Sequence, residues 1–213
     1  MIVYGTSLSP FVRKVMAFGA EKGIELELKS IGLGSDDPEF IEASPFKKIP
    51  GFRDGDFTIS DSSAIIAYLD TVRPEPNLIP TEARARARTI WYDEFSDTIL
   101  TSCGAKMFFN RIVAPRLLKR EGDLALADKA ECEDLPPLLD YLERVLPNSG
   151  YLVEDRLTLA DIAVASPFVN FYHMQIGTGE RPKLARFVER MLDRPSFKPF
   201  VERETAFLER NAA

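Results

Sequence analysis

The stretch SPFKKIPGFRDGDFTISDSSAIIAYLD, residues 44–70, decides how the N-terminal third of this chain folds. Two short runs of apolar and β-branched residues, 49–53 and 57–60, flank Asp54-Gly55, a dipeptide typical of two-residue hairpins in which both central positions need a positive φ. A helix then begins at Asp61. The stretch therefore predicts a β-hairpin followed by a helix. The residues predicted for the apolar face of that helix are Ala64, Ile65, Tyr68 and Leu69.

The residues before this stretch show strand and helix patterns in turn. They predict a strand, a helix that begins at Ser9-Pro10, a second strand and a short helix, at residues 2–5, 10–23, 25–31 and 38–43. The complete order is β-α-β-α-β-β-α within roughly 72 residues, which is the thioredoxin-like arrangement of a small sheet with helices on both faces.

The pattern of the chain changes at about residue 75. Three prolines in VRPEPNLIPT, residues 72–81, forbid a continuing helix and indicate a linker. The segments beyond it have helical periodicity, with breaks at Pro115 and at three loops rich in proline or glycine. These predicted helical segments are 82–110, 123–145, 158–174, 183–193 and 196–211. The sequence therefore predicts an α/β thioredoxin-like domain over residues 1–74 and an all-α helical bundle domain over residues 82–213.

Composition argues against several classes of protein. The formal net charge of −6 argues against a phosphate-binding surface, and so against nucleic acid as a partner. The two cysteines, Cys103 and Cys132, form no C-x-x-C motif, and with a single histidine they leave no cluster of metal ligands. We therefore expect neither a dithiol redox enzyme nor a metal site.

Nothing in the sequence indicates a membrane partner. The chain has no uncharged apolar run of about 18 residues, which a membrane-spanning helix requires. Its first residues, MIVYGTSLSPFVRKV, lack the basic start and long apolar run of a secretory signal. We therefore expect a soluble, cytoplasmic protein.

Ser9-Pro10 and Ile49-Pro50 each have a structural and a functional interpretation. Ser9-Pro10 is a good helix start, but a hydroxyl at that position also lies where the helix dipole stabilises a sulfur anion. Ile49-Pro50 is an ordinary strand boundary. In a thioredoxin-like fold, however, this proline is usually cis, and the main-chain groups of Ile49 are then exposed to a peptide-like ligand.

Asp61-Ser62 and Lys47-Lys48 have the same double interpretation. Asp61-Ser62 is a helix cap, but N–H groups at a helix start also bind a carboxylate, and a neighbouring acid can hold an amine. Lys47-Lys48 is a pair of solvated lysines or the positive charge for a second carboxylate. No single motif is specific. Their order and spacing fit a ligand with a central thiol and a carboxylate at each end, and glutathione is such a ligand.

Three segments carry a resemblance to a known family. They are SPFVRKVMAFGAEKGIELE from residue 9, SPFKKIPGFRDGDFTISDSSAIIAYLD from residue 44 and RLTLADIAVASPF from residue 156. They resemble cytosolic glutathione transferases, most closely the phi, tau and neighbouring bacterial classes, and the match runs over nearly the whole chain. The resemblance implies an enzyme that conjugates the thiolate of glutathione, its co-substrate, to hydrophobic electrophiles that lie between the two domains.

The resemblance also implies roles for single residues. Ser9 donates a hydrogen bond that activates the thiol, and Pro50 is cis. The other contacts of glutathione fall to Lys48 at the glycine carboxylate, the main chain of Ile49 at the cysteinyl unit, and Asp61 with Ser62 at the γ-glutamyl group. Two residues differ from those that some members of the family have at the matching positions. Ser9 stands where omega-type members have the Cys needed for mixed-disulfide reduction, and Asp61 stands where phi and tau members usually have the longer Glu.

Several alternatives stay open at this level. Ser7 in the same loop and Tyr4 near the end of the first strand are the other hydroxyls that compete with Ser9. A non-catalytic binding module of the same fold, or a specialised glutathione-dependent isomerase or dehalogenase, would share the motifs. Aromatic residues at helical spacing more often belong to a core than to a pocket. Those considered for an electrophile pocket are Phe11, Trp91, Phe95, Phe108 and Phe109.

The resemblance implies a homodimer in which the helix from Glu82 packs against its symmetry mate. Charged residues early in that helix either pair across the two-fold axis or form a solvated face. They are Arg84, Arg86, Arg88, Asp93 and Glu94. Further along the chain, Thr158 and Asp161 form a capping box, which predicts a structural role. Cys103 is predicted to be a buried thiol and His173 a structural or surface residue.

Overall fold

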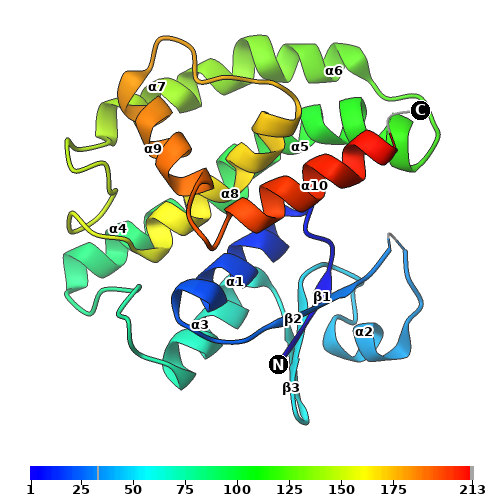
Figure 1. Cartoon of the computed structure of the whole chain (residues 1–213), viewed down its shortest axis with the longest axis vertical. Coiled ribbons are helices and arrows are strands. Elements are labelled where there is room, and N and C mark those ends of the chain that lie inside the picture. The colour runs from blue at the N-terminus through cyan, green and yellow to red at the C-terminus, as the bar shows by residue number, and fades with distance from the viewer. Residues whose placement is uncertain (33, 212–213) are drawn as a thin grey trace. The chain divides into compact units, whose positions relative to one another are not determined.

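The structure is a computed structural model that describes residues 1–32 and 34–211 (Figure 1). The chain divides into two compact units, Met1–Ile79 and Pro80–Ala213. We call them the N-terminal unit and the helical unit. In the part of the chain that the structure describes, no helix has the length and apolar character needed to cross a membrane.

The N-terminal unit contains a four-stranded sheet and three helices in the predicted order. The strands are β1 (Ile2–Gly5), β2 (Glu27–Ser30), β3 (Gly51–Asp54) and β4 (Phe57–Ser60), and the helices are α1 (Pro10–Glu21), α2 (Pro38–Ala43) and α3 (Ser62–Val72). The order across the sheet is β2-β1-β3-β4. β1 runs parallel to β2 and antiparallel to β3, and β3 runs antiparallel to β4. The thioredoxin-like arrangement is confirmed.

Alternation along the strands separates the two faces of this sheet. Val3 pairs with Phe52, whose ring centroid lies 5.6 Å from that of Tyr68 in α3. The next residue, Tyr4, points to the other face, where its ring centroid lies 6.5 Å from that of Phe40 in α2. Helices α1 and α3 therefore cover one face of the sheet, and α2 covers the other (Figure 1).

The hairpin differs in detail from the prediction. Asp54 pairs with Phe57, so the two loop residues are Gly55 and Asp56, and Asp54 is the last residue of β3. Of the two loop residues only Gly55 has a positive φ, of 61°. The expectation that Asp54 and Gly55 both occupy central positions with positive φ is therefore wrong. A glycine at the first central position is the pattern of a type II′ turn, which needs only one positive φ.

The apolar face of α3 is rotated slightly from the predicted one. Ile65 and Leu69 are buried as expected, and Ile66 is buried as well. Ala64 and Tyr68 are only half-buried. Tyr68 lies at the edge because its hydroxyl donates a hydrogen bond of 2.8 Å to Asp54 Oδ2 at the hairpin.

Lys22, at the end of α1, holds the beginning of the segment that follows α3. Its side chain is fully buried, and its ammonium lies 2.5 Å from Asp70 Oδ1. The same ammonium donates to the main-chain oxygens of Arg73, at 2.8 Å, and Pro74, at 2.9 Å. Burying an ammonium is costly unless its donors are satisfied, and here three acceptors surround it.

The helical unit contains seven α-helices and three π-helical segments among the described residues. They are α4 (Ala83–Glu94), η1 (Phe95–Leu100), α5 (Thr101–Phe108), η2 (Phe109–Leu117), α6 (Leu124–Lys129), η3 (Ala130–Asp134), α7 (Leu135–Val145), α8 (Leu159–His173), α9 (Pro182–Leu192) and α10 (Lys198–Arg210). Helix α8 is buried along almost its whole length and contacts α4, α5 and α9. It is the central helix of this unit.

The predicted break at Pro115 is wrong, because the helical segment continues through this residue to Leu117. Proline has no N–H to donate, and its ring clashes with the preceding turn of a regular α-helix. Here the turn is widened into a π-helix, in which the N–H of Leu118 donates to the carbonyl of Val113 at 3.0 Å.

Two residues singled out by the sequence lie inside the helical unit. Cys103 is buried, as predicted, and its thiol donates to the carbonyl of Ala130 at 3.7 Å. The side chain of His173, at the end of α8, is also buried, and its Nε2 lies 3.0 Å from Oε2 of the equally buried Glu204 side chain in α10. Both residues are therefore parts of the core of this unit.

Candidate functional site

The register of the sheet brings three of the predicted motifs to one edge. Tyr4 pairs with Gly51, and Gly51 pairs with Ser60. Each of these residues lies at or next to the point where its strand connects to a predicted motif: the loop to Ser9 follows β1, Ile49-Pro50 precedes β3, and Asp61 follows β4. Segments that are far apart in the sequence therefore meet at the same end of three neighbouring strands.

Ser9 caps the start of α1. Its Oγ accepts a hydrogen bond of 3.5 Å from the N–H of Val12, and its own N–H donates to the carbonyl of Thr6 at 3.0 Å. Pro10 occupies the first helical turn, as predicted. Because the hydroxyl oxygen acts as the acceptor in this cap, its proton can still be donated to another group. Ser9 is half-buried, so a ligand can reach it.

Two contacts join the start of α1 to the other motifs. A Cβ atom added to Gly5 would lie 2.6 Å from Cγ2 of Val12 and 3.3 Å from Cβ of Ile49, so these side chains close around the end of β1. On the other side, the ammonium of Lys14 in α1 donates to Oγ of Ser63 in α3 at 3.3 Å. The first two turns of α1 are therefore held between the segment before β3 and the first turn of α3.

The hydroxyl of Tyr4 is engaged on the opposite face of the sheet. Arg53 Nε donates to it at 3.2 Å, and the hydroxyl in turn donates to Oε2 of Glu39 at 3.5 Å. The ring is fully buried against α2, whereas Ser9 belongs to α1 on the other face. Ser7 lies half-buried in the turn between β1 and α1.

The two lysines before β3 have different surroundings. Lys47, with a φ of 54°, forms an ion pair with Asp36. Lys48 is exposed, and its main chain is fixed by the buried Ser44, whose Oγ donates to the Lys48 carbonyl at 2.6 Å and accepts from the Lys48 N–H at 3.0 Å. Of the two lysines, Lys47 therefore has a carboxylate partner among the described residues, whereas no ion pair involves Lys48 there. Sequence reasoning missed Ser44, because a serine in a loop gives no local signal of its partner.

The Ile49–Pro50 peptide bond is cis, as the resemblance implies. Within the described residues, the main-chain N–H and C=O of Ile49 have no hydrogen-bond partner. Backbone groups in this state favour pairing with an extended, peptide-like ligand, as an added strand would do.

Asp61 and Ser62 begin α3 with unusual backbone geometry. Asp61 has a φ of 86°, which a residue other than glycine rarely adopts and which costs roughly 1–3 kcal/mol. Its Oδ1 accepts hydrogen bonds from the N–H groups of Ser63, at 2.9 Å, and Ala64, at 3.0 Å. Asp61 is exposed and Ser62 is buried. No sequence pattern predicted this φ, and strain of this kind is most common at ligand-binding sites.

The aromatic residues considered for an electrophile pocket separate into two groups. Phe95 and Phe108 are buried core residues of the helical unit. Trp91 is 49% exposed, and its indole N–H donates to the hydroxyl of Tyr141 at 3.0 Å. Phe109 is also partly exposed, and Phe11 in the N-terminal unit is half-buried. Exposure therefore leaves Trp91 and Phe109 available to a ligand within the helical unit, whereas Phe95 and Phe108 are not.

The charged residues of α4 also differ from the prediction. Arg84, Arg86 and Arg88 are exposed, and so is Glu94. Asp93 is only 2% exposed, so neither of the two alternatives considered for these residues, pairing across a two-fold axis or a solvated face, fits it. Its helical position places it on the side that packs into the helical unit, beside Tyr92.

Thr158 and Asp161 stabilise the start of α8. The Asp161 carboxylate accepts from the N–H of Thr158 at 2.9 Å and from the N–H of Leu152 at 2.8 Å, and the Thr158 hydroxyl donates to it at 3.1 Å. Burial raises the pKa of Asp161 to about 6, because desolvation outweighs these three hydrogen bonds, which act to lower it. The pair therefore caps a helix, as the motif predicts.

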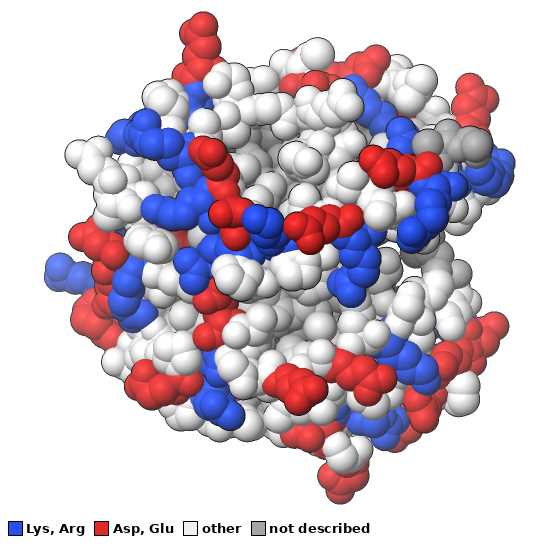
Figure 2. Space-filling model, in the orientation of Figure 1, with Lys and Arg blue, Asp and Glu red and all other residues white. Residues whose placement is uncertain are grey.

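Charge and metal-ligand groups give no competing site. On the face shown in Figure 2, acidic and basic side chains are interspersed, and no broad field of one sign is visible. Among the residues that the structure describes, no group of three or more His, Cys, Asp or Glu side chains is placed to hold a metal ion. The edge where α1, Ile49 and α3 meet is thus the strongest candidate.

Related proteins are known for both units. Residues 3–77 match the family described as glutathione S-transferase, N-terminal domain, and residues 117–204 match glutathione S-transferase, C-terminal domain. The chain is 29% identical to a glutathione S-transferase of Hyoscyamus muticus, over 95% of this chain and 98% of that protein. It is 30% identical to glutathione S-transferase 3 of Zea mays, over 93% and 92% of the two chains. Among solved structures, glutathione transferase F7 from Populus trichocarpa has a TM-score of 0.81 at 26% identity, over 94% of this chain and 97% of that chain.

Proposed function

The chain belongs to the glutathione S-transferase family and is a glutathione transferase, and on that premise we propose that Ser9 activates the thiol of bound glutathione for attack on a hydrophobic electrophile. The observation that carries this proposal is the meeting of three segments at one edge of the sheet. Ser9, the main chain of Ile49, and Asp61 with Ser62 then face a single tripeptide. Glutathione is the co-substrate, and no metal takes part in the proposed reaction.

Each part of glutathione has a partner of suitable chemistry in this proposal. The exposed ammonium of Lys48 meets the glycine carboxylate, and the unpaired main chain of Ile49, next to Pro50, meets the cysteinyl unit. Ser62 and the start of α3 bind the γ-glutamyl carboxylate, while Asp61 holds the amine. Both cap bonds of Asp61 are accepted by Oδ1, so Oδ2 is left for that amine, which supports the role in spite of the shorter side chain.

The free energy needed to lower the pKa of the glutathione thiol is within the range that a hydrogen bond from Ser9 and the helix N-terminus can supply. Lowering the pKa of a thiol from about 8.5 to about 6.5 requires roughly 2.7 kcal/mol. A hydrogen bond to a charged group contributes about 1.5–3 kcal/mol, and a helix N-terminus adds about 0.3–1 kcal/mol. One hydroxyl at the start of α1 is therefore sufficient, and no buried base is required. The thiol proton passes to water, and the thiolate then forms a bond to the electrophilic carbon of the co-substrate while the leaving group departs with the electron pair of the bond that breaks.

The decisive experiment compares Ser9→Ala with Ser7→Ala and Tyr4→Phe. We expect Ser9→Ala to lose the ultraviolet thiolate absorbance of bound glutathione, and kcat/KM with a chromogenic aryl halide to fall about 25-fold at pH 7, because a rise of the thiol pKa from about 6.5 to about 8.5 lowers the thiolate fraction from roughly 76% to roughly 3%. Retention on immobilised glutathione should change little. Tyr4→Phe should keep the thiolate signal, since its hydroxyl is held by Arg53 and Glu39. An unchanged thiolate signal in Ser9→Ala would transfer the role to another hydroxyl.

The same assays separate the alternative functions. Retention on glutathione without conjugation of any electrophile would favour a non-catalytic binding module. Turnover confined to a halogenated or isomerisable substrate would favour a dehalogenase or an isomerase. In the proposal the N-terminal unit carries the glutathione site and the helical unit selects the hydrophobic co-substrate.

A homodimer is part of the proposal. Phe46, between α2 and β3, is 85% exposed, and exposed Ile90 and Trp91 lie on α4 near the exposed arginines. Such apolar side chains favour burial against a second copy. Sedimentation equilibrium over a range of concentrations should give a dimer, and Phe46→Glu should shift it toward monomers. Leu124→Glu, at an exposed leucine of α6, serves as the matched control.

A further inference from the structure

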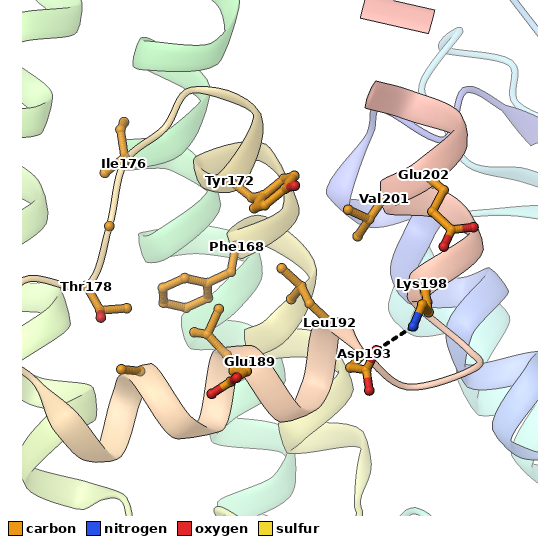
Figure 3. A pocket seen from close by; sticks show the side chains of 13 residues that line it. Phe168, Tyr172, Ile176, Thr178, Glu189, Leu192, Asp193, Lys198, Val201 and Glu202 are labelled. Carbon is orange, nitrogen blue, oxygen red and sulfur yellow. Dashed lines mark hydrogen bonds and ion pairs between the residues drawn. The ribbon is translucent and has the colours of Figure 1, made fainter. Parts of the chain in front are cut away.

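A pocket lies entirely within the helical unit, with a volume of about 540 Å³ (Figure 3). It is bounded by the end of α8, the loop 174–181, α9 and the beginning of α10. Small-molecule sites usually have volumes of about 300–1,000 Å³. None of the residues proposed for glutathione binding lines this pocket. Its main apolar side chains are Phe168, Ile176, Leu192 and Val201.

The loop that forms one wall is held in place by hydrogen bonds. The Arg181 guanidinium donates to the carbonyl of Thr178 at 3.0 Å and to Asp140 Oδ1 in α7 at 2.8 Å. The N–H of Ile176 donates to the carbonyl of Phe171 in α8 at 2.9 Å. A ligand would therefore meet a wall that is already formed and would not have to order it.

The pocket is lined by more acidic than basic side chains. Asp193 and Lys198 form an ion pair of 2.7 Å between the end of α9 and the beginning of α10. Two more carboxylates, Glu189 and Glu202, line the pocket, and Lys198 is the one cation among the described residues that line it. The pocket therefore has an excess of negative charge above an apolar floor.

An aromatic ring adds a second feature that attracts cations. Tyr172 is 54% exposed, and Figure 3 shows it on α8 together with Phe168, between the loop with Ile176 and the helix with Val201. The face of an aromatic ring carries negative partial charge and attracts a cation within about 6 Å. Phe168, by contrast, is almost fully buried and offers an apolar floor.

We propose that this pocket binds a small organic cation with an aromatic or aliphatic body. The body lies against Phe168 and Leu192, and the positive group lies near the ring of Tyr172, in the field of Glu189 and Glu202 on opposite sides of the pocket (Figure 3). An anion of the same shape is repelled by the same carboxylates, and a neutral molecule gains nothing from them, so charge selects the occupant. This binding is independent of the glutathione site, so the two proposals stand or fall separately.

The test uses benzyltrimethylammonium and the anion phenylmethanesulfonate, which has a similar shape, with the full chain in titration calorimetry and ligand-observed NMR. We expect saturable binding of the cation, weakening as salt is added, and at least about tenfold weaker binding of the anion. Absence of saturable cation binding, or equal binding of the two ions, would overturn the proposal.

Variants then locate the binding. Glu189→Gln/Glu202→Gln should weaken cation binding about tenfold, whereas Glu133→Gln/Glu209→Gln, an equal charge change at two exposed positions outside the pocket, should not. Ala185→Phe should fill the pocket and abolish binding in a chain that is still folded by circular dichroism. Unchanged binding in the double variant, or a change of oligomeric state in Ala185→Phe, would assign the pocket to another role and contradict the proposal.

Discussion

A Cβ atom on Gly5 would lie 2.6 Å from Cγ2 of Val12, closer than non-bonded carbon atoms approach in folded proteins. The same atom would lie 3.3 Å from Cβ of Ile49. Gly5 thus sets how closely the first turn of α1, which contains Ser9 at its cap, packs against the segment before β3. The distance between two proposed glutathione contacts, Ser9 and Ile49, therefore depends on the absence of a side chain at Gly5.

We therefore expect Gly5→Ala to weaken glutathione binding and to cost roughly 1–3 kcal/mol of stability, as overpacking does. Titration calorimetry with glutathione and urea unfolding would measure the two effects. Gly32→Ala is the matched control, because a Cβ atom there meets nothing within 4 Å. Wild-type affinity in Gly5→Ala would show that the first turn of α1 and Ile49 do not share a ligand.

The buried ammonium of Lys22 should be a large contributor to the stability of the N-terminal unit. Lys22→Met keeps the length of the side chain but leaves Asp70 and two main-chain carbonyls without their donor. Breaking a buried pair in this way costs about 3–5 kcal/mol. Urea unfolding should show the loss, and limited proteolysis should become faster within residues 73–82.

The control for this prediction is an exposed ion pair. Lys106→Met removes the partner of Asp134, and both side chains of that pair are more than one-third exposed. Such a pair contributes about 0–1 kcal/mol. Equal losses of unfolding free energy in Lys22→Met and Lys106→Met would contradict the prediction that burial makes the Lys22 ion pair the stronger of the two.

Asp161 should make stability depend on pH. Its folded-state pKa of about 6 lies above the ordinary value of 3.8, so the protonated acid is favoured by folding. The stability that it contributes is fully present below about pH 4 and is lost as the pH rises through about 6, by roughly 3 kcal/mol in total. The difference in unfolding free energy between wild type and Asp161→Asn should shrink by this amount between pH 4 and pH 7. A difference that does not vary with pH would refute the prediction.

Thr158→Ala tests the other half of the same cap. Loss of its hydroxyl removes the hydrogen bond to Asp161 and should cost roughly 0.5–2 kcal/mol. Conjugation kinetics of the folded variant should match those of the wild type. A variant of normal stability with reduced turnover would show that the cap has a role in catalysis.

The buried pair of His173 and Glu204 should be strongly coupled. His173→Leu leaves the buried carboxyl group of Glu204, with 1% exposed side-chain surface, without this partner, and we expect a loss of about 1–3 kcal/mol. Removing both groups in His173→Leu/Glu204→Leu should cost less than the sum of the single changes. Urea unfolding of the four proteins in a double-mutant cycle gives the coupling, and strict additivity would argue against the pair.

The two cysteines should react at very different rates. Burial raises the pKa of the Cys103 thiol to about 11, so it forms almost no thiolate at pH 8, whereas Cys132 is exposed. Iodoacetamide should therefore alkylate only Cys132 in the folded protein, and both residues in urea. Mass spectrometry after digestion distinguishes them. Alkylation of Cys103 at the rate of Cys132 would show that the helical unit opens readily around α5.

Local patterns determined much of this protein before any tertiary contact was known. The short helix at Pro38–Ala43, the hairpin, and the serine and proline that begin α1 depend on neighbouring residues, so the sequence was sufficient to predict them. The order of the glutathione motifs was also readable, because each one starts or ends an element. The predictions that were wrong concern geometry beyond the local pattern. They are the position of the glycine in the hairpin and the break at Pro115, which a π-helical turn accommodates instead.

Only the tertiary structure decided that those motifs lie together. The pairing of Tyr4, Gly51 and Ser60 places three separate segments at one edge, and this register depends on contacts between residues far apart in the chain. The same is true of the ion pair of Lys22, which joins the end of α1 to the end of α3, and of the packing that buries Asp93. Sequence periodicity reports the face that a residue occupies, but the partner on that face is chosen only when the elements pack.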